Sequence, residues 1–178
     1  MKPTHLLVTA MAACWFAGAA ALAAPPATPP SSTAPAAAGG LIDHYDEAAI
    51  REMVAQMGHK VVRTADQGDD RPFLVMETKT GELVAALATA CHGDGPKRLC
   101  QGIQLIVDMV PPEDANAEGL VEEFNGTYAA AKFFYVDGKV RLSRYIILDD
   151  GITRKNFQAN VDVMVEIADL VKKEMTSG

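Results

Sequence analysis

Two cysteines nine positions apart, Cys91 and Cys100, form the first residue pattern with chemical consequences. Gly93, Gly95 and Pro96 lie between them and favour a reversal of the chain. A hairpin here would bring the two thiols together. A disulfide at its base would restrict the unfolded chain by about 2–3 kcal/mol in the chain-entropy model. We therefore predict a structural disulfide between Cys91 and Cys100.

Two other chemistries fit the same residues less well. A redox-active pair normally has the spacing C-x-x-C, with one thiol at a helix N-terminus that lowers its pKa. A zinc site could draw on Cys91, His92, Asp94 and Cys100, but this spacing does not match a known tetrahedral cluster. A small-molecule or enzymatic site built around His92 and Asp94 remains an alternative.

Other residue types that carry catalysis are scattered along the chain. His44 and His59 stand apart from a serine nucleophile, and the sequence contains neither G-x-S-x-G nor a glycine-rich phosphate loop. Asp66, Asp69 and Asp70 lack the spacing and the bidentate glutamate of an EF-hand. The sequence predicts no enzyme, no cofactor and no metal site.

The N-terminus has the three parts of a secretory signal. Lys2 provides the positive charge, residues 6–22 form an apolar run, and Ala21-Leu22-Ala23 is a small-x-small cleavage site. We predict that residues 1–23 are a signal peptide and that the mature chain is periplasmic. Secretion out of the cell is the alternative destination. An uncleaved anchor helix is the alternative, because the apolar run nearly reaches the ~20 residues that span a bilayer.

The mature chain divides into a linker and one domain. Residues 24–40 are rich in Ala and Pro and predict a disordered tether, or alternatively a proline-rich ligand. Residues 41–178 are long enough to form one domain with its own core. Without residues 1–23 the chain keeps 15 basic and 23 acidic residues, a net charge of −8. This charge argues against nucleic acid or an anionic membrane as the partner.

The hydrophobic pattern predicts an α+β fold with an antiparallel sheet packed on helices. The expected order is α-β-β-β-β-α-β-β-α. Asp43 is expected to cap the first helix, Gly58 to end it, and Thr153 to cap the last helix. The expected elements are a helix over 43–57, strands over 59–65, 72–78, 83–91 and 100–110, a helix over 114–131, strands over 132–136 and 139–148, and a final helix after Thr153.

The last two predicted strands are apolar on both faces. Phe133 and Tyr135 alternate with other apolar residues, and Tyr145 and Ile147 lie opposite the apolar set that contains Leu142. Helices on one side of the sheet cover only one of these sets. The last helix, a second copy, a protein partner or a ligand must cover the other. We predict a partner or dimer surface formed by Phe133, Tyr135, Tyr145 and Ile147.

Four sequence blocks, in this order and spacing, give the chain from about 41 to 175 a family resemblance. They are Met57-Gly58; Cys91 followed by Cys100-Gln101-Gly102-Ile103-Gln104; Phe124-Asn125 running into Ala131-Lys132 and Asp137-Gly138; and Asp150-Gly151-Ile152-Thr153. With these blocks the chain resembles the YbjN-domain family of bacterial sensory-transduction regulators.

The resemblance implies a fold similar to that of type III secretion chaperones, which are often dimeric and bind extended stretches of other proteins. The family has no established catalytic residues to carry over. Together with the residue pattern, it predicts a non-enzymatic binding or regulatory module that docks a protein partner or a second copy. A structural role in an envelope assembly is a further alternative.

Overall fold

The computed structural model describes residues 40–65, 71–95 and 98–177. The predicted signal peptide and the predicted linker up to residue 39 lie outside these ranges. No helix within the described ranges is long and apolar enough to cross a membrane.

Within the described ranges the chain forms three helices and six strands in the predicted order, and the predicted fold class is confirmed. They are α1 (Glu47–Gln56), β1 (Lys60–Thr64), β2 (Phe73–Glu77), β3 (Leu83–His92), β4 (Leu99–Met109), α2 (Ala117–Thr127), β5 (Lys132–Val136), β6 (Lys139–Ile147) and α3 (Arg154–Ser177).

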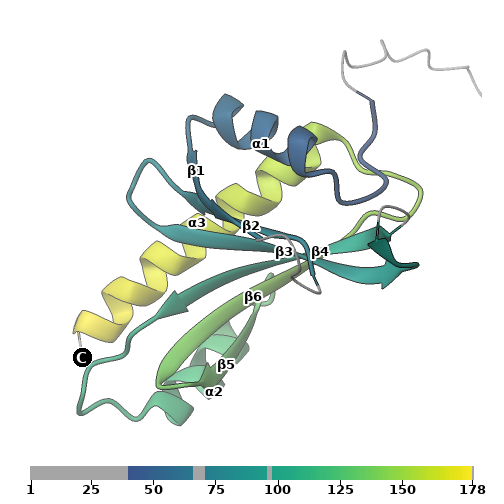
Figure 1. Cartoon of the computed structure of the whole chain (residues 1–178). Coiled ribbons are helices and arrows are strands. Elements are labelled where there is room, and N and C mark those ends of the chain that lie inside the picture. Colours follow the sequence, from purple (N-terminus) through teal and green to yellow (C-terminus); the bar gives the residue numbers. More distant parts are fainter. Residues whose placement is uncertain (1–39, 66–70, 96–97, 178) are drawn as a thin grey trace, which may run out of the picture. The chain divides into compact units, whose positions relative to one another are not determined.

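All six strands form one antiparallel sheet in the order β1-β2-β3-β4-β6-β5. The neighbours β4 and β6 are separated along the chain by α2 and β5, so β6 returns to the interior of the sheet and β5 becomes its edge (Figure 1). The hairpin between β5 and β6 turns at Asp137-Gly138. Both residues have positive φ, as a tight two-residue hairpin requires.

The helices share one hydrophobic core with one face of the sheet. Ile50 and Met53 of α1, Phe124 of α2, and Val161 and Met164 of α3 belong to a single buried cluster with inward-facing strand residues. Each of these side chains is at most 1% exposed. The helices therefore cover only the face of the sheet that carries the buried alternate residues.

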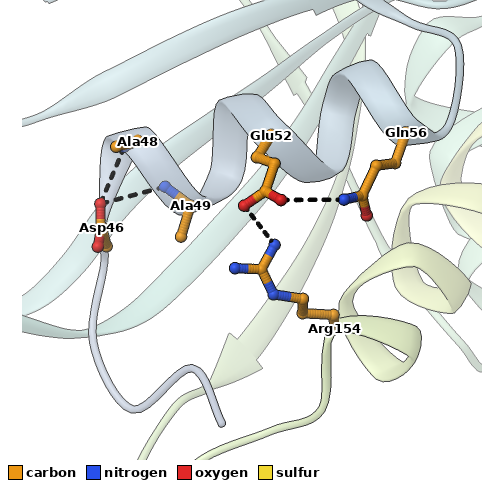
Figure 2. Close-up of polar contacts among 6 residues, drawn as sticks. All are labelled: Asp46, Ala48, Ala49, Glu52, Gln56 and Arg154. Atoms are coloured by element: carbon orange, nitrogen blue, oxygen red, sulfur yellow. Dashed lines mark hydrogen bonds and ion pairs between the residues drawn. The ribbon is translucent and has the colours of Figure 1, made fainter. Parts of the chain in front are cut away.

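The first helix begins later than predicted. Asp46, not Asp43, caps α1, and its carboxylate accepts hydrogen bonds from the backbone N–H groups of Ala48 and Ala49 (Figure 2). The carboxylate of Asp43 forms a hydrogen bond with the ring of its neighbour His44, and Asp43 lies before the helix. The predicted end is confirmed, because Gly58 adopts a positive φ just after the helix. Arg154 binds Glu52 and so joins α1 to α3 (Figure 2).

The second helix is shorter than predicted, 117–127 instead of 114–131. Asn116 caps it by accepting from the N–H of Gly119, and residues 112–115 form a turn before it. The prolines at 111 and 112 have no N–H for a strand ladder, and β4 ends before them at Met109. The predicted cap of the last helix is confirmed, since Thr153 Oγ1 accepts from the N–H of Asn156 at 3.1 Å.

Candidate functional site

The second face of the sheet has no helix over it in the described part of the chain. Its residues are the alternate members of each strand, for example Ile106 of β4 opposite Ser143 of β6. We call this surface the outer face. Because the helices pack on the other side, its apolar residues stay exposed or half-buried.

Several large apolar side chains lie on the outer face. Ile147 is 60% exposed and Tyr145 is 52% exposed, both on the interior strand β6. Large exposed apolar side chains that gather on one face are typical of an interaction surface rather than of scattered surface residues. The further apolar members are Phe73, Val75, Leu83, Leu87, Ile106 and Phe134.

The side chain of Tyr145 lies close to a glycine on the neighbouring strand. Gly102 of β4 lies diagonally across from Tyr145, next to Ile147, and its hydrogen faces the phenol ring. A methyl group added at Gly102 would lie 2.8 Å from Cζ of Tyr145 and 2.6 Å from Oγ1 of Thr89. Glycine at this position therefore leaves room for the Tyr145 phenol against β4. Sequence reasoning missed this contact, although a glycine inside a strand pattern is a signal of close approach.

The outer face carries more cations than carboxylates, although the whole chain has a net charge of −7. The strand register places the charged side chains of this face, namely Lys60, Arg63, Lys132, Lys139 and Arg141 against Glu77 and Asp108. The acidic excess of the chain therefore lies elsewhere, and the outer face is both apolar and cationic.

One ion pair lies on this face. Arg141 donates from Nε and Nη2 to the two carboxylate oxygens of Asp108, at 2.7 and 2.8 Å. These bonds hold the pKa of Asp108 below its usual value, and partial burial opposes the shift. The pair neutralises one cation of the outer face but leaves Lys132 without an ion-pair partner among the described residues.

The predicted partner surface is not one continuous face. Tyr145 and Ile147 are exposed on the outer face, but Phe133 is 1% exposed and packs against Phe124 and Tyr128 of the α2 region. The prediction was wrong to place Phe133 at the surface. Phe133 pairs with the inward-facing Leu142 of β6 and so points toward the helices. Tyr135 shares the inward side with Phe133, yet it is half-exposed near the end of β5.

The outer edge of β5 is blocked near the start of the strand. The side chain of Asn125 in α2 accepts from the N–H of Phe133 at 2.9 Å and donates to its carbonyl at 3.1 Å. This side-chain amide occupies the groups that a further strand would use. Proteins often protect edge strands in such ways. Sequence reasoning quoted Asn125 but did not foresee this role.

The cysteines lie next to the loop that joins β3 to β4. Cys91 and Cys100 are direct cross-strand partners and are joined by a disulfide. His92 and Asp94 are exposed and lie in the sequence between the two cysteines. An open polar cavity of about 380 Å³ is lined by Asp94 together with Arg71 and Thr89, and His92 does not line it. No group of three or more His, Cys, Asp or Glu residues in the described ranges is arranged to hold a metal ion.

A second cavity, of about 350 Å³, lies between the start of β1 and α3. His59 lines it together with Asp162, Glu166 and Asp169. His59 Nδ1 accepts from the N–H of Lys79 at 3.3 Å, and Nε2 is buried without a partner among the described residues. Burial lowers the pKa of His59, and the charge of Lys79 lowers it further.

Comparison with solved structures confirms the fold. The chain is similar to a chain in the structure titled "Crystal Structure of the ExsC-ExsE Complex", with a TM-score of 0.53 and 16% sequence identity. The match covers 72% of this chain and 91% of that chain. At this identity the likeness establishes the arrangement of helices and sheet, which agrees with the fold that the family resemblance implied. No curated protein matches the chain.

The family comparison covers most of the described chain. The model of the family YbjN, described as "Putative bacterial sensory transduction regulator", matches residues 48–176. This range runs from α1 to the end of α3 and includes the outer face and the disulfide hairpin. The chain therefore belongs to the YbjN family.

Proposed function

We propose that this protein is an exported, non-enzymatic binding module that holds a protein partner on the outer face of its sheet. The observation that carries the proposal is the exposure of Tyr145 and Ile147 on a strand whose other side contributes Val140, Leu142 and Ile146 to the core beneath the helices. A sheet that faces water on one side normally carries polar residues there. Apolar residues at these positions gain free energy when a partner covers them.

The proposed role is regulatory or chaperone-like. A regulator of this kind acts by occupying or releasing a partner, which requires a surface and not a reaction centre. The description of the family as a transduction regulator supports this role, and so does the likeness to a chain crystallised as part of a two-protein complex. Export to the periplasm is proposed from residues 1–23, and the cross-strand disulfide suits an oxidising compartment.

The test compares matched surface substitutions in crosslinked pull-downs from the cell envelope. Ile147→Ser removes an apolar side chain from the outer face, whereas Val110→Ser removes one from the loop after β4, where it is 76% exposed. We expect the Val110 variant to retain every partner that the unaltered chain captures and the Ile147 variant to lose at least one. Equal capture by the two variants would show that partners bind elsewhere.

A further inference from the structure

The strand β6 has an unpaired edge next to the outer face. The register between β5 and β6 ends at Lys132 opposite Ser143, because the chain before Lys132 turns away at residues 128–131. Residues 144–147 of β6 therefore have β4 on one side and no strand of the described chain on the other.

Two hydrogen-bond patterns identify which backbone groups point to this free edge. The N–H of Leu148 donates to the carbonyl of Gln101, so the even-numbered residues of β6 bond to β4. Asn125 binds the N–H and the carbonyl of Phe133. The backbone groups of Phe133 therefore point away from β6 and form no hydrogen bond with it. Both observations give the same alternation. The N–H and carbonyl groups of Tyr145 and Ile147 therefore point away from β4, and no described residue bonds to them there.

We infer that this edge accepts an extended, acidic segment of a partner protein, which adds to the sheet as a strand beside Tyr145 and Ile147. The inference rests on the proposed function and specifies its binding mode. Strand addition supplies backbone hydrogen bonds, and alternate side chains of the added segment would contact the outer face. An open groove of about 560 Å³, lined by residues 129–132 and 143–145, lies along this edge.

Charge identifies the occupant. Lys132 stands at the point where β5 begins and has no ion-pair partner among the described residues, and the outer face beside it carries a cationic excess. An acidic segment complements this field. A second copy would bring the same cations to the same face. Residues 1–39 of this chain contain no acidic residue and include several prolines, which lack the N–H that strand pairing needs.

The experiment uses the full chain and synthetic peptides. The probe is a soluble peptide of alternating glutamate and valine. Its controls are a lysine–valine peptide and a glutamate–valine peptide that is N-methylated at alternate residues and so cannot pair along one edge. Amide hydrogen exchange by NMR reports on each backbone group. In the free protein we expect fast exchange at Tyr145 and Ile147 and slow exchange at Arg144 and Ile146.

With the glutamate peptide, exchange at Tyr145 and Ile147 should slow on the order of tenfold or more, and neither control should produce this effect. Ile147→Pro removes one edge N–H without removing a bond to β4 and should weaken binding at least about tenfold. Ile147→Ala keeps that N–H and should weaken binding less than the proline variant. Circular dichroism of both variants checks that they fold.

Three results would overturn the inference. If the glutamate peptide binds over the outer face without slowing these two amides, strand addition is wrong while docking on the face stands. If the two amides are already protected in a concentration-dependent dimer, a second copy occupies the edge. If the lysine peptide binds as well as the glutamate peptide, or if neither binds, the acidic partner is wrong.

Discussion

The contact between Tyr145 and Gly102 gives the sharpest test of how the outer face is built. Gly102→Ala places a methyl carbon 2.8 Å from Cζ of Tyr145. The optimum separation of two carbon atoms is about 3.5–4.0 Å, so the ring or the backbone must shift. Forcing extra volume into a packed site typically costs about 1–3 kcal/mol. Tyr145 is half-exposed and its ring can move away, so we expect a cost near the lower end, about 1 kcal/mol.

The same substitution should behave differently when the ring is absent. In a Tyr145→Ala background the phenol contacts are gone. Of the three atoms nearest the added methyl group only Oγ1 of Thr89 remains, on a side chain that can rotate. Gly102→Ala should then leave the free energy of unfolding unchanged or raise it by about 0.5 kcal/mol, because glycine inside a strand loses more conformational entropy on folding than alanine does. The two substitutions should therefore couple by roughly 1–1.5 kcal/mol. Urea unfolding followed by far-UV circular dichroism measures this coupling. Equal effects of Gly102→Ala in both backgrounds would refute the packing that we describe.

Three further predictions follow from the structure. Replacing Cys91 and Cys100 with serine should lower the free energy of unfolding by roughly 2–3 kcal/mol, and thiol titration of the denatured, unreduced chain should find neither of these two cysteines free. The lowered pKa of His59 means that the unfolded chain binds the proton more tightly. Stability measured by urea unfolding should therefore fall as the pH drops through the range in which the unfolded histidine titrates, and His59→Gln should reduce this fall. Asp108→Asn should cost about 0.2–1 kcal/mol at neutral pH. The pKa of Asp108 is lower in the folded chain than in the unfolded chain, so this cost should shrink as the pH falls from the ordinary pKa of Asp toward the folded pKa. A cost that does not change with pH would contradict the ion pair.

Local patterns in the sequence predicted most of the elements. Ile50 and Met53 stand three positions apart, as on one face of a helix, and Asp137-Gly138 is a two-residue hairpin signal. Both patterns can be seen in the sequence because they depend on neighbours within a few residues. Element ends were less accurate. Asp43 and Asp46 are both good helix caps in sequence, and only the path of the chain beside Cys100, where the N–H of Tyr45 donates to the Cys100 carbonyl, leaves Asp46 at the helix start.

The candidate site needed information that local patterns do not contain. Phe133 and Ile147 both belong to strands that are apolar on both faces, so alternation alone does not tell which set meets the helices. The answer depends on β6 pairing with β4, which brings Gly102 beside Ile147 and Tyr145 from distant positions in the chain. The role of Asn125 likewise arises only when α2 packs beside the edge of β5.

The central claim, that a partner binds the outer face, is tested most directly by site-specific photocrosslinking in living cells. A photoreactive amino acid is placed at one position per variant: Ile147 on the outer face, Leu170 on α3, or Val110 in the loop after β4. We predict a discrete covalent adduct with another protein from position 147 and none from the other two positions. Adducts only from position 170 or 110, or none at any position while the variants remain folded and exported, would contradict the claim.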